Sequence, residues 1–158
     1  SAQSDSLPLT AANLCNRAFP NMSRPAKRQS FIPPDTCELS ALLHFTPAVR
    51  VGNMIWVSGQ VGLAGPMEPA KGMEAQARLA FEALQRTLEF AGSDLRDVVE
   101  LTTFHTDLRA EIEDFMKARD AYFNDNYPAW TAVGVAELGL PGLCLEIRAV
   151  AVAGSGAT

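Results

Sequence analysis

The sequence predicts an α+β fold in which a single β-sheet carries two helices on one face. Three observations lead to this prediction. Two stretches place apolar residues at helical spacing, five shorter runs are rich in Val, Ile, Thr and aromatic residues, and the order is β-β-α-β-α-β-β. With 158 residues the chain is long enough for one domain with one hydrophobic core.

The first 36 residues differ in composition from the rest. They are rich in Ser, Asn and Gln, show no sustained period, and contain five prolines: Pro8, Pro20, Pro25, Pro33 and Pro34. Such a composition is typical of an extended or flexible arm. We therefore expect an arm over residues 1–36 and a folded domain over residues 37–158.

The folded part begins with a predicted hairpin. His44–Val51 and Met54–Val61 have the composition of strands, and the pair Gly52-Asn53 between them can supply the positive φ angles of a tight turn. A loop rich in Gly and Pro follows over residues 62–72.

The two predicted helices are Met73–Ala91 and Ala110–Asn124, separated by a strand over Val98–Asp107. Gly92 is placed to stop the first helix, and Pro128 prevents continuation of the second. The apolar stripe of the first helix consists of Ala77, Phe81, Leu84, Leu88 and Ala91.

Two strands, Trp130–Leu138 and Leu143–Ala153, complete the predicted sheet. With both helices on one face, the other face still carries apolar residues and has no helix left to cover it. Self-association is the simplest way to cover such a face. We therefore expect a homo-oligomer.

Composition argues against several classes of function. The net charge is −5 and the only basic cluster, Arg24, Lys27 and Arg28, lies in the arm, so we expect no nucleic-acid partner. Cys144 and His105 are expected to be structural, and no Cys or His has metal-ligand spacing, so we expect no metal site. We also expect no organic cofactor. The sequence shows no membrane-length apolar run and no secretory signal, so we expect no membrane partner and a cytoplasmic protein.

A single carboxylate, Glu146, lies inside an otherwise apolar run. An isolated buried charge is costly, so Glu146 must be paired, solvated in a cleft, or protonated. Its partner would be Arg148, which strand alternation places on the same face. The alternative is a cleft in which the carboxylate meets a ligand, and the residues alone leave both open.

Three blocks of the sequence are informative together: Gly52-Asn53 with Ser58-Gly59-Gln60, the strand Thr102-Thr103-Phe104, and the segment from Pro128 to Glu146. In these blocks the chain resembles the YjgF/RidA family of small trimeric proteins, several of which hydrolyse reactive imines and enamines. The resemblance implies a chorismate-mutase-like (RidA-like) subunit, a homotrimer, and ligand clefts between neighbouring subunits. It also implies that Glu146 activates or orients water and that the backbone at Ser58-Gly59 lines the cleft.

The chain departs from the deaminase branch of that family at four positions. Trp130 stands where the branch has an Arg that holds the substrate carboxylate, and the indole has one N–H donor and no charge. Ala132 replaces a Cys, Phe45 a Tyr and Met116 an Asn. These replacements predict a non-standard substrate preference. The exchange of Arg for Trp130 favours larger, flatter and less charged molecules.

Two of the candidate residues allow a second interpretation. Trp130 is either an aromatic wall for a planar ligand or a filler of the core or of a subunit interface. Arg50 is either a substitute anchor for an anionic ligand or a solvated arginine on an edge strand.

We predict a RidA-like protein that hydrolyses or binds small reactive imine, enamine or related carbonyl metabolites. The rivals are a non-catalytic binding module of the same fold and, more weakly, an endoribonuclease, which the acidic charge disfavours. The predicted catalytic residue is Glu146. The predicted ligand-binding residues are Phe45, Arg50, Ser58, Gly59, Met116, Trp130, Thr131 and Ala132.

Overall fold

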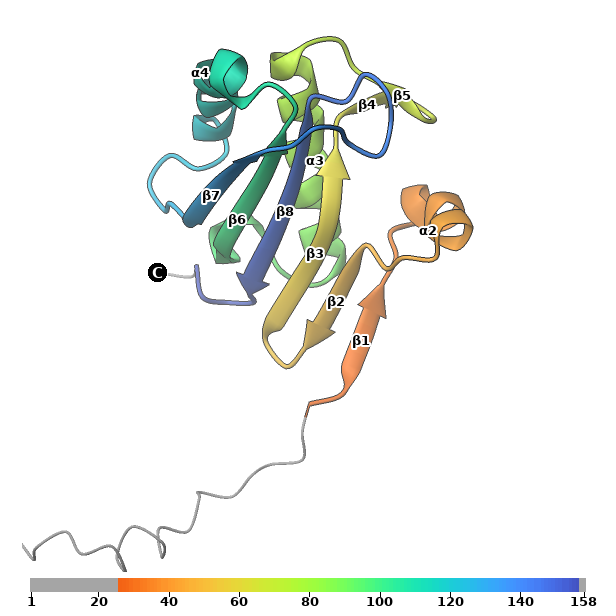
Figure 1. The fold of residues 1–158 in the computed structure, drawn as a ribbon. Helices are drawn as coiled ribbons and strands as arrows, with labels where there is room; N and C mark the ends of the chain where they lie inside the picture. Colours follow the sequence, from red (N-terminus) through yellow and green to blue (C-terminus); the bar gives the residue numbers. More distant parts are fainter. Residues whose placement is uncertain (1–25, 157–158) are drawn as a thin grey trace, which may run out of the picture.

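A six-stranded sheet in the order β1-β2-β3-β8-β6-β7 forms the centre of the protein (Figure 1). This computed structural model describes residues 26–156, so residues 1–25 of the expected arm and residues 157–158 lie outside it. The strands along the chain are β1 (Arg28–Phe31), β2 (Ala48–Val51), β3 (Met54–Val61), β6 (Val98–His105), β7 (Ala129–Gly134) and β8 (Leu145–Val152). Only β6 and β7 pair in parallel. A small hairpin of β4 (Leu63–Gly65) and β5 (Glu68–Pro69) stands outside the sheet.

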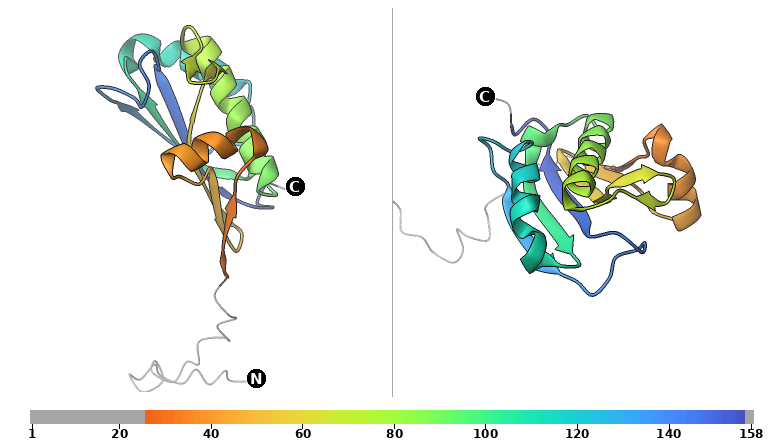
Figure 2. Two further views of the ribbon diagram at one scale, coloured as in Figure 1. Left: turned by 90° about the vertical axis from the view of Figure 1, so that its right-hand side faces the viewer. Right: turned by 90° about the horizontal axis from the view of Figure 1, so that it is seen from above.

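Two long helices cover one face of the sheet. α3 (Met73–Phe90) and α4 (Leu108–Asp120) lie side by side on that face, and in the described part of the chain no helix covers the other (Figure 2). A short helix, α2 (Cys37–Leu43), follows the 3-10 turn η1 (Pro34–Thr36) and lies to the side of β3 (Figure 1). A second 3-10 turn, η2 (Leu95–Asp97), leads into β6.

The core lies between the sheet and α3. The predicted apolar stripe of this helix is buried, and it packs against the inward side chains of β3 and β8. α4 closes the core with Phe115, whose ring stacks on Phe81 of α3 at 5.9 Å between ring centroids. The buried members from the sheet are Ala48, Ile55, Val57, Val98, Leu101, Leu145, Ile147, Ala149 and Ala151.

The β2–β3 turn is the one that the sequence predicts. Val51 pairs with Met54, so Gly52 and Asn53 form a two-residue loop, and Gly52 has a φ of +61°. Glycine adopts this angle without steric cost, which explains its place at the first turn position.

A β-bulge interrupts the pairing of β3 with β8. Val57 pairs with Ala149 and Gln60 with Ile147, so Ser58 and Gly59 together lie opposite the single residue Arg148. A bulge of this kind bends the strand and redirects the side chains around it. It lies two residues from Glu146 along β8.

Two elements at the start of the domain were missed by the sequence analysis. β1 pairs with β2 and lies inside the segment expected to be an arm, and α2 precedes the hairpin. The prediction of two helices was therefore wrong, because α2 is a third. His44, expected at the start of a strand, instead ends α2 in the left-handed region at a φ of 54°. The helix has only seven residues, too few for apolar periodicity to reveal it.

The other predicted elements correspond to β2, β3, α3, β6, α4, β7 and β8, with shifted ends. α4 begins two residues earlier and ends four residues earlier than predicted, and β7 ends at Gly134 rather than Leu138. The segment after Gly134 forms a loop of bends and turns that leads into β8.

Candidate functional site

Glu146 lies on β8, on the face of the sheet that the helices leave uncovered. The residues on either side of it, Leu145 and Ile147, are fully buried toward the helices, whereas Glu146 is half-buried. It pairs with Val61 of β3 and with Phe104 of β6. The carboxylate therefore stands on a central strand that is paired with a neighbouring strand on both sides.

The side chain of Glu146 extends across Gly59 in the bulge of β3. A Cβ atom at Gly59 would collide with Oε1 of Glu146 and would lie 2.5 Å from its Cδ and 2.9 Å from its Cγ. The absence of a side chain at Gly59 thus creates the space that the carboxylate occupies. Glycine is required here for close approach and not for a positive φ angle.

No counter-ion holds Glu146 in the described part of the chain. Arg148 pairs instead with Glu100 at 3.4 Å, so the pairing of Glu146 with Arg148, one of the two alternatives that the sequence left open, does not form. Glu146 also makes no side-chain hydrogen bond with residues 26–156, and its oxygens are not among the fully buried unpaired atoms. Burial raises the pKa of this carboxyl above its ordinary value.

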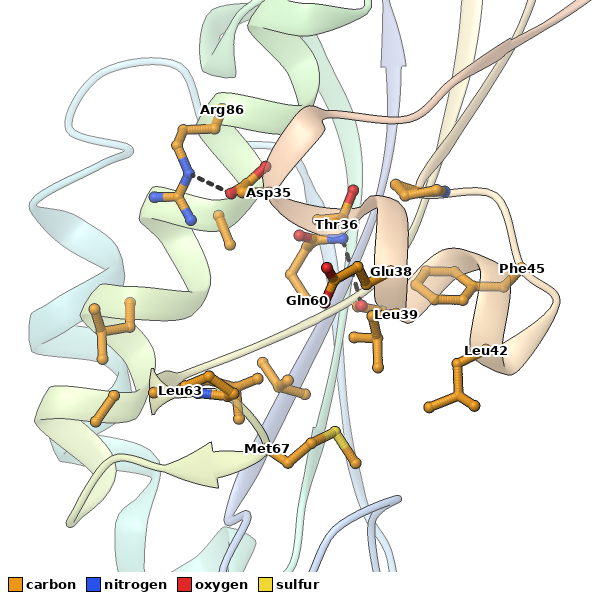
Figure 3. Close-up of a pocket in the computed structure, with 18 residues that line it drawn as sticks. Asp35, Thr36, Glu38, Leu39, Leu42, Phe45, Gln60, Leu63, Met67 and Arg86 are labelled. Atoms are coloured by element: carbon orange, nitrogen blue, oxygen red, sulfur yellow. Dashed lines mark hydrogen bonds and ion pairs between the residues drawn. The ribbon is translucent and has the colours of Figure 1, made fainter.

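A cavity of about 580 Å³ that Gly59 also lines opens next to β3 (Figure 3). α2 and α3 form its walls, the end of β3 forms its floor, and the β4–β5 hairpin closes one end. Phe45 and Gly59, both predicted to bind ligand, line it together, and Arg86 pairs with Asp35 there at 3.5 Å. Its apolar lining comes mainly from Leu39, Leu42, Leu63, Met67, Leu79 and Ala83.

Ser58 fixes the chain beside this cavity. Its hydroxyl donates to the carbonyl oxygen of Thr46 at 2.7 Å, and its backbone N–H donates to that of Pro47 at 2.9 Å. These bonds extend the pairing of β3 to the residues just before β2 and hold the segment that carries Phe45. The hydroxyl donor of Ser58 is therefore already used within the fold.

A second group of predicted residues lies at the opposite edge of the sheet. Met116 belongs to α4, whereas Trp130, Thr131 and Ala132 belong to the edge strand β7. Trp130 and Ala132 pair with inward residues of β6 and face α4, but Thr131 pairs with Thr102 and points to the uncovered face. Within one chain this group is separated from Gly59 by β8 and β6.

Three residues contact the indole of Trp130. Its Nε1 donates to Oγ1 of Thr103 at 3.0 Å, and the centroids of its ring and that of Phe115 are 5.7 Å apart. The guanidinium carbon of Arg119 lies 4.6 Å from the centroid of the indole. Thr103 also bonds Nε2 of His105 at 2.8 Å. Trp130 thus has no free donor to offer a ligand.

Arg50 lies away from both groups. Its Nη1 donates to the carbonyl oxygen of Ala91 at the end of α3, and its Nε donates to that of Gly52, each at 2.9 Å. An arginine at this position binds the unpaired carbonyl at the C-terminal end of a helix. Because β1 pairs with β2, Arg50 is also not on an edge strand, so neither sequence-based interpretation describes it.

The remaining titratable candidates are structural. His105 is fully buried, and burial lowers its pKa. Burial also raises the pKa of the Cys144 thiol to about 11, which keeps it protonated near neutral pH. Residues 26–156 contain no group of three or more Cys, His, Asp or Glu placed to hold a metal ion, and no helix among them is long and apolar enough to span a membrane.

Sequence reasoning missed three residues that shape these two groups. Thr103 binds the indole of Trp130, Arg119 stacks on it, and Leu39 of α2 lines the cavity. The spacing of Phe115 and Arg119, four apart on α4, is a signal that places both on one helix face. Leu39 gave no signal, because its helix was not predicted.

Comparison with known proteins agrees with this fold. The family model described as Endoribonuclease L-PSP matches residues 36–153. RutC family protein YjgH of Escherichia coli (strain K12) is 37% identical over 126 residues, which cover 79% of this chain and 95% of that protein. The 2-iminobutanoate/2-iminopropanoate deaminase of Rattus norvegicus is 36% identical over 121 residues, 73% of this chain and 84% of that protein.

A solved structure supports the same assignment. The crystal structure of a member of the YjgF/YER057c/UK114 family from Mycobacterium tuberculosis is 27% identical, with a TM-score of 0.70 over 80% of this chain and 99% of that one. The family match covers three quarters of the sequence, and the arrangement of sheet and helices agrees with it. The chain belongs to the YjgF/RidA family.

Proposed function

We propose that this protein hydrolyses small reactive imines or enamines, with Glu146 as the group that accepts and donates the proton. The observation that carries the proposal is a half-buried carboxylate without a counter-ion, held over a glycine on a central strand. Several relatives are named as 2-iminobutanoate/2-iminopropanoate deaminases, which supports the reaction class.

The chemistry requires one group that can both accept and donate a proton. Water adds to the carbon of the C=N bond while Glu146 removes a proton from the water molecule. The imine nitrogen becomes protonated. The resulting carbinolamine then loses ammonia, its C–N bond breaks, and a carbonyl compound forms. A carboxyl whose pKa is raised toward neutrality serves both steps better than an ordinary one.

We propose further that the reacting cleft forms between copies of the chain in a homotrimer. Two observations support this arrangement. Apart from Arg50, the predicted ligand-binding residues fall into two groups that β8 and β6 separate, and the uncovered face carries partly exposed apolar side chains. Among these are Met54, Trp56, Val99 and Val133, each between 36% and 41% exposed. Stacking copies on this face would cover them and would bring the β7–α4 edge of one copy toward Glu146 of the next.

The test is the release of ammonia from imines generated in situ, measured for the wild type and for Glu146→Gln. We expect turnover of at least one imine of a panel that includes 2-iminobutyrate, and a loss of about 100-fold or more in Glu146→Gln, as is typical when a proton-transfer group is removed. Trp130→Arg is a second arm, because it introduces the guanidinium of the deaminase branch. Binding of carbonyl compounds without turnover in any variant would overturn the proposal in favour of a non-catalytic binding module.

A further inference from the structure

Arg119 on α4 is the most enclosed arginine of the ion pairs in the described chain. Its side chain is 15% exposed, whereas the arginines of the other pairs are 42% to 71% exposed. Its guanidinium lies over the indole of Trp130 at 4.6 Å from the ring centroid. Arginine stacks on aromatic rings through the flat face of the guanidinium, and this contact fixes the orientation of the group.

Stacking leaves the donors of the guanidinium available, because all of its N–H bonds lie in the plane of the group. Nε and Nη2 of Arg119 both donate to a single oxygen, Oδ1 of Asp120, at 3.0 and 2.7 Å. Nη1 has no partner among residues 26–156 and is not one of the buried unpaired atoms there, so it reaches solvent. The edge formed by Nη1 and Nη2 is therefore open to an acceptor from outside the chain.

Two other arginines of the sheet, Arg50 and Arg148, are engaged elsewhere. Arg50 binds carbonyl oxygens at the end of α3, and Arg148 pairs with Glu100 on the uncovered face. Arg119 instead lies against Trp130, on the edge that the proposed trimer would turn toward Glu146 of a neighbouring copy. A guanidinium with an open edge, partly shielded from water, is well suited to a carboxylate, which it can bind through two parallel hydrogen bonds.

We propose that Arg119, oriented by Trp130, binds a carboxylate group of the ligand. This inference rests on the proposed function, because it takes the β7–α4 edge to be one wall of the reacting cleft. Trp130 then acts as a positioning residue for Arg119 and not as a wall for a flat ligand. The expectation of a less charged ligand, which came from Trp130 alone, is replaced by a preference for imino acids over neutral imines.

Asp120 makes this proposal sharply testable. Its carboxylate bonds the same guanidinium, so it draws Arg119 away from an incoming anion and repels that anion. Asp120→Asn should therefore strengthen the binding of a carboxylate ligand. A purely structural Arg119–Asp120 pair predicts no such gain, because loss of the pair would then only loosen the end of α4.

The experiment is calorimetric titration of the full chain with 2-oxobutyrate and with its neutral analogue 2-oxobutanamide. Arg119→Gln should weaken binding of 2-oxobutyrate about 10- to 100-fold, the usual range for a lost charge-assisted contact, and should change binding of the amide less than about 2-fold. Asp120→Asn should tighten binding of 2-oxobutyrate about 2- to 5-fold, as expected for an exposed charge. Arg119→Lys should fall between the wild type and Arg119→Gln, since it keeps the charge but loses the fork.

Arg96→Gln is the matched control. Arg96 also uses Nε and Nη2 to bond an aspartate, Asp94, but it is 71% exposed, so its replacement should leave both ligands unaffected. Equal affinity of wild type and Arg119→Gln for 2-oxobutyrate, or weaker binding in Asp120→Asn, would overturn the inference. So would a wild type that hydrolyses neutral imines but binds no 2-oxobutyrate, and that result would leave the proposed function standing.

Discussion

Replacing Gly59 by Ala tests how closely the catalytic proposal depends on the position of Glu146. The new Cβ would lie 2.5 Å from Cδ and 2.9 Å from Cγ of Glu146, whereas ordinary van der Waals contacts between such atoms begin near 3.4 Å. On one side of Gly59 the backbone of Ser58 is bonded to Pro47, and on the other side Gln60 pairs with Ile147. The flexible glutamate side chain must therefore move rather than the backbone. The carboxylate is then displaced by about 1 Å or more, and a displacement of that size can cost on the order of 100-fold in rate.

Stability should change little in the same variant. Gly59 does not require a positive φ angle, and the Cβ meets only a side chain, so the fold can accept it. Ala in place of Gly even stabilises by about 0.4–1 kcal/mol where the backbone is compatible. We therefore expect Gly59→Ala to unfold in denaturant within about 1 kcal/mol of the wild type while its turnover of imines falls about 100-fold.

Gly139→Ala provides the matched control, since nothing lies within 4 Å of a Cβ at Gly139 and its φ is not positive. This variant should keep full activity. The double variant Gly59→Ala/Glu146→Gln should be no less active than Glu146→Gln alone, because both changes remove the same carboxylate from the reaction. Full turnover by Gly59→Ala would refute the argument, as would additive losses in the double variant.

Three further predictions follow from the same contacts. Glu146→Gln should raise the free energy of unfolding at pH 8 by about 1 kcal/mol, because the charged carboxyl is penalised by burial. The raised pKa means that the folded state holds this proton more tightly than the unfolded state. Wild-type stability should therefore fall as pH rises through the raised pKa, and denaturant titrations at pH 4.5 and 8 should show this fall reduced in the variant. Arg50→Ala should lower the free energy of unfolding by about 1–2 kcal/mol through the lost helix-end bonds but leave 2-oxobutyrate binding unchanged, which calorimetry checks. Trp56→Glu, on the uncovered face, should convert the trimer to smaller species in sedimentation experiments, and an unchanged trimer would contradict the proposed assembly.

The central part of the fold could be predicted from the sequence because the patterns that indicate it lie within short stretches of the chain. Periodicity located α3, and the Gly52-Asn53 pair located the hairpin, since each depends on a few neighbouring residues. α2 was not readable, because one short helix without repeating periodicity resembles a loop in sequence. β1 was missed for a related reason: four residues become a strand only through pairing with β2.

For the candidate site, the sequence indicated candidate residues but not the contacts that their side chains make. Glu146 and Gly59 were both singled out, yet the bulge that brings them into contact depends on the register between β3 and β8. Trp130 left two interpretations open, and contacts with Thr103, Phe115 and Arg119 now place it against α4. These contacts join elements far apart in the sequence, so no local pattern predicts them.

The most direct test of the central claim is complementation between two inactive variants. Glu146→Gln removes the carboxylate, and Ala132→Trp blocks the β7 edge, so each variant alone should lack activity. Co-expressed copies that assemble at random should regain about a quarter of wild-type turnover, because that share of the clefts combines an intact Glu146 from one copy with an intact edge from its neighbour. Turnover in the mixture no greater than the sum of the two variants would contradict a cleft shared between copies.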